Sequence, residues 1–121
     1  MAGIVGVLAF DRIWNVSKFV FYGMMGVQHR GYAYSGLSVL GEGFSTIREK
    51  RAPEDLDEEK VAQLNGWAGV GYSGNAEGIP VEGKEAVMVY DGVIKGDLPA
   101  LADAIARDPE RALAEMRGVA S

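Results

Sequence analysis

Glycine is the residue that most restricts how this chain can fold. The sequence holds 17 glycines in 121 residues, about twice the usual share. They are dispersed between short apolar runs, with no internal repeat and no low-complexity tract. Glycines in such places predict turns and close contacts between backbone segments, and they do not indicate a linker. Together with the length, this spacing predicts a single domain over residues 1–121.

Apolar periodicity predicts a mixed chain of the α+β class, in which helices flank a group of strands. Strands are expected at 3–10, 35–40, 44–49, 67–73 and 86–90. Helices are expected from an N-cap at Asn15 to His29–Gly31, over 54–64, and after an N-cap at Asp97, followed by a short turn from Asp108-Pro109 that includes Leu113 and Met116.

The first predicted helix is apolar nearly all round. One face carries Val16, Phe19, Val20, Met24 and Val27, and further apolar side chains, Phe21, Tyr22 and Met25, lie off that face. Such a helix is expected to be buried on more than one side. We therefore expect a homodimer or a hetero-complex whose interface includes this helix or the edge of a strand.

Composition excludes several classes of protein. The net charge of −5 argues against binding to nucleic acid or to anionic membranes. There is no signal-peptide pattern and no apolar stretch approaching the roughly 18 residues of a membrane helix, so a cytoplasmic protein is expected. The absence of cysteine excludes disulfides and zinc–sulfur sites. With His29 as the single histidine, no metal and no cofactor is expected.

Generic catalytic motifs are weak in this sequence. Gly3 with Gly6, and the group Gly69, Gly71 and Gly74, lack the residues that complete a phosphate-binding loop, so strands with close backbone approach are favoured. No Gly-x-Ser-x-Gly motif is present. His29 is a possible general base, but a histidine beside an arginine at a helix end favours a structural role.

Longer motifs carry a resemblance. Met1-Ala2-Gly3-Ile4-Val5-Gly6 is followed by Gln28-His29-Arg30-Gly31, and then by Tyr34-Ser35-Gly36-Leu37. Further on come Leu64-Asn65-Gly66, Val70-Gly71-Tyr72-Ser73-Gly74, Val89-Tyr90-Asp91-Gly92 and Arg117-Gly118-Val119-Ala120-Ser121. In this order the chain resembles the class II, or N-terminal-nucleophile, glutamine amidotransferase domain, and most closely that of the glutamine phosphoribosylpyrophosphate amidotransferases.

The resemblance implies a site whose reactive groups are missing. Ala2 stands where the family has its nucleophilic cysteine, so removal of Met1 would expose an amine with no thiol beside it. Gly71 replaces the arginine that holds the glutamine carboxylate, and Asp91 replaces the asparagine of the oxyanion hole, although the backbone donor Gly92 is kept. The family's Ser-Asp-x-Glu segment has no counterpart between Asp97 and Asp108. By the resemblance, Arg30, Gly31, Gly71 and Ser73 are vestigial substrate-binding positions.

The motif around Gln28 is kept although the catalytic residues are not, so its role is expected to be structural. Arg30 should tie the end of the first helix to neighbouring backbone carbonyls. Gly31 should adopt a conformation that other residues resist.

The resemblance also implies the fold and the function. The expected fold is an abridged α/β/β/α sandwich, the first half of the family's domain, with sheet edges and an inner face left uncovered. The expected function is that of a catalytically inactive amidotransferase-like subunit with a structural, regulatory or ligand-binding role. One alternative is a glutaminase domain, seen as an inactive variant, that feeds ammonia to a synthase in purine or glutamate biosynthesis. A small-molecule sensor is a third, by analogy of fold alone. The partner in a hetero-complex would be a synthase or transferase subunit.

Overall fold

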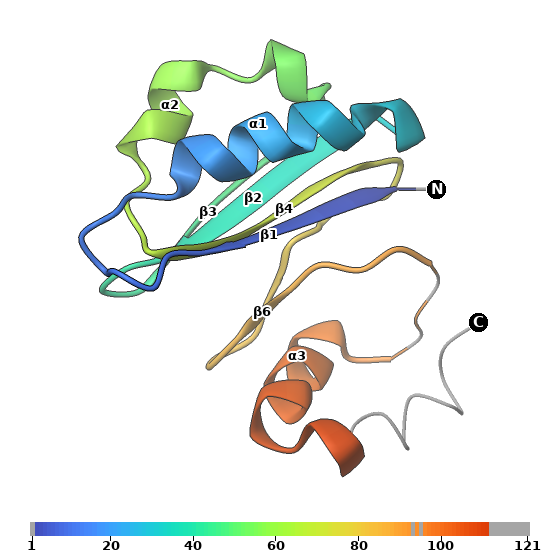
Figure 1. Cartoon of the computed structure of the whole chain (residues 1–121). Coiled ribbons are helices and arrows are strands. Elements are labelled where there is room, and N and C mark those ends of the chain that lie inside the picture. Colours follow the sequence, from blue (N-terminus) through green and yellow to red (C-terminus); the bar gives the residue numbers. More distant parts are fainter. Residues whose placement is uncertain (1, 93, 95, 112–121) are drawn as a thin grey trace.

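The chain folds into an α+β arrangement of short elements (Figure 1). The computed structural model describes residues 2–92, 94 and 96–111. In chain order the elements are β1 (Gly3–Leu8), α1 (Ser17–Val27), the 3-10 turn η1 (Gln28–Arg30), β2 (Tyr34–Leu40), β3 (Phe44–Glu49), the 3-10 turn η2 (Pro53–Asp55), α2 (Glu58–Gln63), β4 (Ala68–Gly74), β5 (Val81–Glu82), β6 (Val87–Met88) and α3 (Leu98–Arg107).

The main sheet has four strands in the order β1-β4-β2-β3, and all neighbours are antiparallel. β4 therefore lies between the first two strands of the chain, with Gly3 opposite Ser73 and Gly36 opposite Tyr72. β1 and β3 are the two edges of this sheet. β5 and β6 form a separate antiparallel hairpin, in which Val81 faces Met88.

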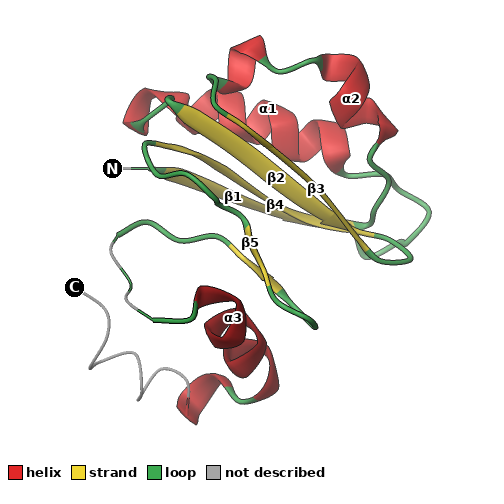
Figure 2. Ribbon diagram, turned by 180° about the vertical axis from the view of Figure 1, so that it is seen from behind, coloured by secondary structure: helices red, strands yellow, loops and turns green. Residues whose placement is uncertain are grey.

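The elements stack in layers. α1 and α2 cover one face of the main sheet, and the β5–β6 hairpin and α3 lie on the other side of it (Figures 1 and 2). The principal core fills the space between the helices and the sheet and consists of Val16, Val20, Phe21, Met24, Leu37, Val39, Leu56 and Val61. A second, smaller cluster is separate from this core. It consists of Ala2, Tyr72 and Ile79, and Val89 and Tyr90 pack against it.

Glycines allow α1 to lie close to the sheet. A Cβ on Gly23 of α1 would lie 2.7 Å from Val5 Cγ1, and a Cβ on Gly71 of β4 would lie 2.6 Å from Met24 Cγ. Real Cβ atoms do not approach other atoms so closely, so a side chain at either residue would force the neighbouring side chain or the helix to shift. The glycine-rich composition thus allows close packing of a helix on a sheet.

Several predicted elements are confirmed, with shifts at their ends. β3 has the predicted bounds, and Asp97 caps α3 by accepting a hydrogen bond from the Ala100 amide (3.1 Å). β1 ends at Leu8, and β6 is the short remnant of the strand predicted over 86–90. Leu113 and Met116 of the turn predicted after Asp108 lie outside the described residues.

The start and the buried face of α1 differ from the prediction. The helix begins at Ser17, and Asn15 Oδ1 accepts hydrogen bonds from the amides of both Ser17 (3.1 Å) and Gly66 (3.3 Å). Asn15 thus joins the start of α1 to the turn before β4. Phe19, predicted on the buried face, is 58% exposed, and Phe21 takes its place in the core. The helix is thus rotated about its axis relative to the prediction. Its inner face carries Val20 and Met24, which lie against Gly69 and Gly71 of β4.

The single helix predicted over 54–64 is wrong. Leu56 has an extended backbone (ψ 145°) and separates η2 from α2. This break turns the Leu56 side chain into the core, where it is buried. Asp57 then caps α2, because its carboxylate accepts a hydrogen bond from the Glu59 amide (2.9 Å). β5 was not predicted, since a strand of two residues has no periodicity to detect.

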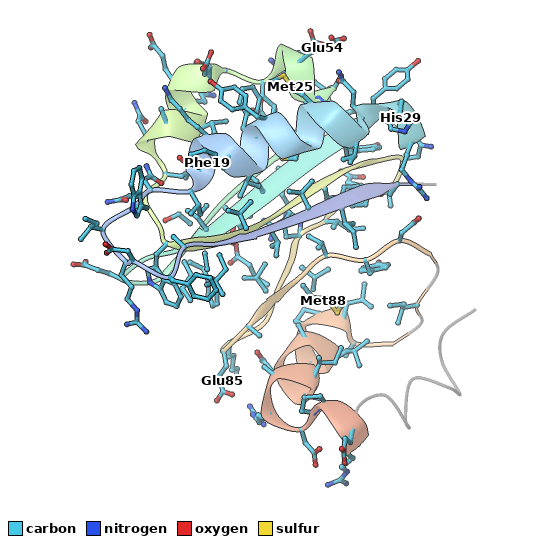
Figure 3. The ribbon with its side chains drawn as sticks, in the orientation of Figure 1. Phe19, Met25, His29, Glu54, Glu85 and Met88 are labelled. Carbon is cyan, nitrogen blue, oxygen red and sulfur yellow. The ribbon has the colours of Figure 1, made fainter. Side chains whose placement is uncertain are left out.

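A carboxylate fastens α3 to the hairpin. Asp103 is buried, and its oxygens accept hydrogen bonds from the amides of Glu85 (2.7 Å), Lys84 (2.8 Å) and Ala86 (3.0 Å). A side chain on Gly83 would collide with this carboxylate. Figure 3 places Glu85 at the tip of the hairpin and Met88 between the hairpin and α3. The amides of Glu85 and Lys84 lower the pKa of Asp103, and that of Ala86 and the nearby Arg107 contribute to the same shift.

Docking of α3 on the hairpin should therefore weaken in acid. A carboxyl whose pKa is lowered by folding stabilises the fold fully above its ordinary value of about 3.9, and this contribution is lost as the pH falls through the lowered pKa. The protection factors of the Lys84, Glu85 and Ala86 amides, measured by NMR as exchange relative to the unfolded chain at the same pH, should fall across that range. Asp103→Asn should bring faster exchange at neutral pH and remove the acid dependence. The control is Asp55→Asn, at an exposed aspartate of η2, which should behave as the unaltered protein does. If Asp103→Asn kept the acid dependence of the unaltered protein, Asp103 would not be the group that titrates.

Within residues 2–92, 94 and 96–111, none of the helices has the length and apolar character needed to cross a membrane.

Candidate functional site

The first described residue, Ala2, lies directly before β1 and is buried, with 5% of its surface exposed. Its neighbours are Tyr72 of β4 and Ile79 of the following loop. Side chains alternate across a strand, so Tyr72 lies on the face of the sheet opposite to α1. Ala2 therefore belongs to a small apolar cluster on the face of the main sheet that is turned toward the β5–β6 hairpin.

Two hydrogen bonds join the end of α1 to the start of the sheet. Arg30 Nε donates to the Ala2 carbonyl oxygen (2.9 Å), which confirms that this arginine ties the end of the helical segment to a backbone carbonyl. Ser73 Oγ donates to the Gly31 carbonyl oxygen (2.5 Å), and this bond is buried. Gly3 lies against Val27, with no room for a side chain between them. The structure thus brings together Ala2, Arg30, Gly31 and Ser73.

Gly31 does not adopt a conformation reserved for glycine. Its φ of 162° and ψ of 140° are extended, and other residues adopt such a backbone as well. The expected strain at this position is absent. The contribution of Gly31 is its carbonyl, which receives the Ser73 hydroxyl.

Gly71 lies away from this group. It faces α1, where a Cβ would lie 2.6 Å from Met24 Cγ and 2.8 Å from Val20 Cγ1. Ala2 packs with Tyr72 on the other face of the same strand. A longer side chain at position 71 would therefore enter the core between β4 and α1.

Asp91 and Gly92 follow a segment that reaches the Ala2 cluster. Val89 and Tyr90 pack against that cluster, and Asp91 comes next and is exposed. Gly92 has a φ of +133°, a conformation that favours glycine. The chain thus passes Ala2 before it presents the Asp91 carboxylate to solvent.

Gln28 and His29 have separate environments. Gln28 Oε1 is buried, and no described residue donates a hydrogen bond to it. His29 is exposed, and Figure 3 places it at the opposite end of the helical segment from Phe19. No hydrogen bond or ion pair joins the His29 side chain to the part of the chain that the structure describes, so no contact supports the structural role expected for it.

The described residues around Ala2 offer few reactive groups. The Tyr72 hydroxyl accepts a hydrogen bond from the Ala76 amide (3.1 Å), and the chain has no cysteine. No group of three or more acidic, histidine or cysteine side chains within the described ranges could hold a metal ion. An apolar cavity of about 390 Å³ lies further along the sheet, where Gly6, Leu8, Ser38, Val70 and Val87 contribute to its lining.

Two features that hold this region together were not predicted from the sequence. Ile79 and Pro80 cover Gly36 of β2, where a side chain would collide with the Ile79 carbonyl. Asp103 organises the hairpin from α3. The one signal for Asp103 was an acidic residue among the apolar side chains of the predicted helix.

Comparison with known proteins gives a distant relationship. No family model matches the sequence. The chain is 30% identical over 74 residues to the amidophosphoribosyltransferase of Methanocaldococcus jannaschii. The match covers 60% of this chain and 16% of that protein.

Proposed function

We propose that this chain is a glutamine amidotransferase-like domain that does not hydrolyse glutamine and serves as a structural, regulatory or ligand-binding subunit. The observation that carries the proposal is the position of Ala2. It lies directly before β1, where its carbonyl oxygen accepts a hydrogen bond from Arg30 and its side chain packs among apolar side chains. An N-terminal-nucleophile enzyme needs a thiol or hydroxyl at that position.

The retained framework supports the amidotransferase part of the proposal. The distant similarity to an amidophosphoribosyltransferase agrees with the motifs that carry the resemblance. Helices cover one face of the main sheet, and a second small sheet and α3 lie on the other side (Figure 2). We infer that this is an abridged N-terminal-nucleophile sandwich.

The missing groups support the inactive part of the proposal. No sulfur nucleophile exists in the chain. At the position assigned to the oxyanion hole, the Asp91 carboxylate would repel a developing negative charge, whereas an amide would donate a hydrogen bond to it. Loss of one such donor typically lowers the rate by about a hundred- to a thousandfold.

The contacts of the Gln28–Gly31 motif support a structural role for it, one that needs no catalysis. Arg30 and Gly31 hold the end of the helical segment against Ala2 and Ser73. These two bonds place the motif in the packing of the first strand, which is independent of glutamine hydrolysis.

The pure protein should release no ammonia from glutamine and should not be labelled by electrophiles that mimic glutamine. Ammonia release is measured with a coupled enzymatic assay, and labelling by intact-protein mass spectrometry. A fully active class II amidotransferase, assayed in parallel, controls for the reagents. Time-dependent ammonia release that is abolished by altering one residue near the N-terminus would contradict the proposal.

A further inference from the structure

Among the residues that the structure describes, β1 is an edge strand, and no other described strand pairs with its outer side. Ala9, directly after it, donates its amide to the Trp67 carbonyl in continuation of the β1–β4 register (2.8 Å). Backbone groups of successive residues point to opposite sides of a strand. The odd-numbered residues of β1 therefore pair with β4, and the N–H and C=O groups of Ile4, Gly6 and Leu8 point outward from the sheet.

The two edges of the main sheet differ in charge. β3 carries Arg48 and Glu49, and charged side chains on an edge strand oppose its pairing with another chain. β1 contains only glycine, valine, isoleucine and leucine. In a chain with a net charge of −5, copies repel one another least where the contact surface is uncharged. β1 is therefore the edge suited to a second copy.

We propose that β1 pairs with β1 of a second copy of this chain, antiparallel and about a two-fold axis at Gly6, so that one sheet continues through the dimer. This inference rests on the strand edge and does not depend on the proposed function.

The side chains of β1 fit this register. With Gly6 opposite Gly6, Ile4 of each copy lies opposite Leu8 of the other, and the outward-pointing backbone groups of both strands face one another. Val5 packs against α1, so Ile4 and Leu8 lie on the opposite face. They are 50% and 58% exposed in the single chain, and each would cover the other. No side chain crowds the axis, because no atom lies within 4 Å of a Cβ built on Gly6.

The loop after β1 can extend the contact. A stable interface buries at least about 1,000 Å² in total, which is more than a pair of six-residue strands supplies. Phe10 and Ile13 are 98% and 85% exposed. They follow the edge strand directly and are the nearest large apolar side chains that can supply further area.

A single thiol tests this arrangement, because the chain has no cysteine. With Gly6→Cys, a short thiol-specific bifunctional cross-linker should convert most of the protein to covalent dimer. Gly26→Cys is the matched control, since Gly26 of α1 is also an exposed glycine with open space at its Cβ, and the same cross-linker should give no covalent dimer of this variant. Equal cross-linking of both variants, or none in Gly6→Cys, would overturn the proposal.

Amide exchange of the unaltered protein gives a second test that does not depend on a variant. At high protein concentration the amides of Ile4, Gly6 and Leu8 should be protected, and dilution should remove this protection. The amides of Val5 and Val7 should stay protected throughout, because they pair with β4. Fast exchange of the three outward amides at every concentration would show a free edge. Protection that persists at dilutions at which light scattering shows a monomer would show that another part of the same chain covers the edge, and either result overturns the proposal.

Discussion

Replacement of Gly71 with arginine should abolish the cooperative fold and should not create a site for the carboxylate of glutamine. The Cβ atom alone would lie 2.6 Å from Met24 Cγ and 2.8 Å from Val20 Cγ1, and both side chains are fully buried. Overpacking of a core typically costs about 1–3 kcal/mol, and burial of an unpaired guanidinium costs several kcal/mol more. Domains of this size are stable by about 5–15 kcal/mol.

Thermal unfolding followed by circular dichroism measures this effect. Gly26→Arg adds the same charge at an exposed position of α1 with open space at its Cβ, and it should unfold at or above the temperature of the unaltered protein. Gly71→Ala should destabilise less than Gly71→Arg. The double variant Gly71→Ala, Met24→Ala should lose less stability than the sum of its single changes, because the shortened Met24 removes the collision. A cooperative Gly71→Arg variant of unchanged stability would show that position 71 does not face α1.

The sequence predicted the elements whose signals are local. The strand at Phe44–Glu49 follows a Gly-Glu-Gly turn, and Asp97 is a strong capping residue before an apolar repeat. Turn chemistry and capping depend on neighbouring residues alone, so they can be recognised without knowledge of the tertiary structure. The link between Arg30 and a backbone carbonyl was also predicted, because the motif places the arginine at the end of a helix.

Features that depend on distant partners were not predicted. Phe19 and Phe21 both fit an apolar helix, and only the surface of the sheet decides that Phe21 is buried. The break at Leu56 has the same cause, since that side chain reaches the core only if the helix is interrupted. In the candidate site, a collinear motif gave the order of Ala2, Gly71 and Asp91. It could not show that Gly71 faces α1 while Ala2 lies on the opposite face.

Ala2→Cys should fail to restore glutaminase activity. A thiol at this position would be surrounded by Tyr72 and Ile79, and apolar surroundings disfavour the thiolate that attacks the substrate. No arginine is available at position 71 to hold the carboxylate of glutamine. Asp91 would add negative charge where the oxyanion forms. Restoring the thiol alone therefore leaves the carboxylate-binding arginine missing and the Asp91 carboxylate in place.

The proposal of an amidotransferase-like domain without catalytic function is tested most directly by ammonia release from glutamine in the Ala2→Cys protein. The sample is prepared with Met1 removed, so that the cysteine is N-terminal, and its mass is checked. Its melting temperature is compared with that of the unaltered chain to establish that it is folded. We predict ammonia release no faster than that of the unaltered chain. Turnover approaching that of an active class II amidotransferase would contradict the account, because it would show that the cysteine was the one group missing.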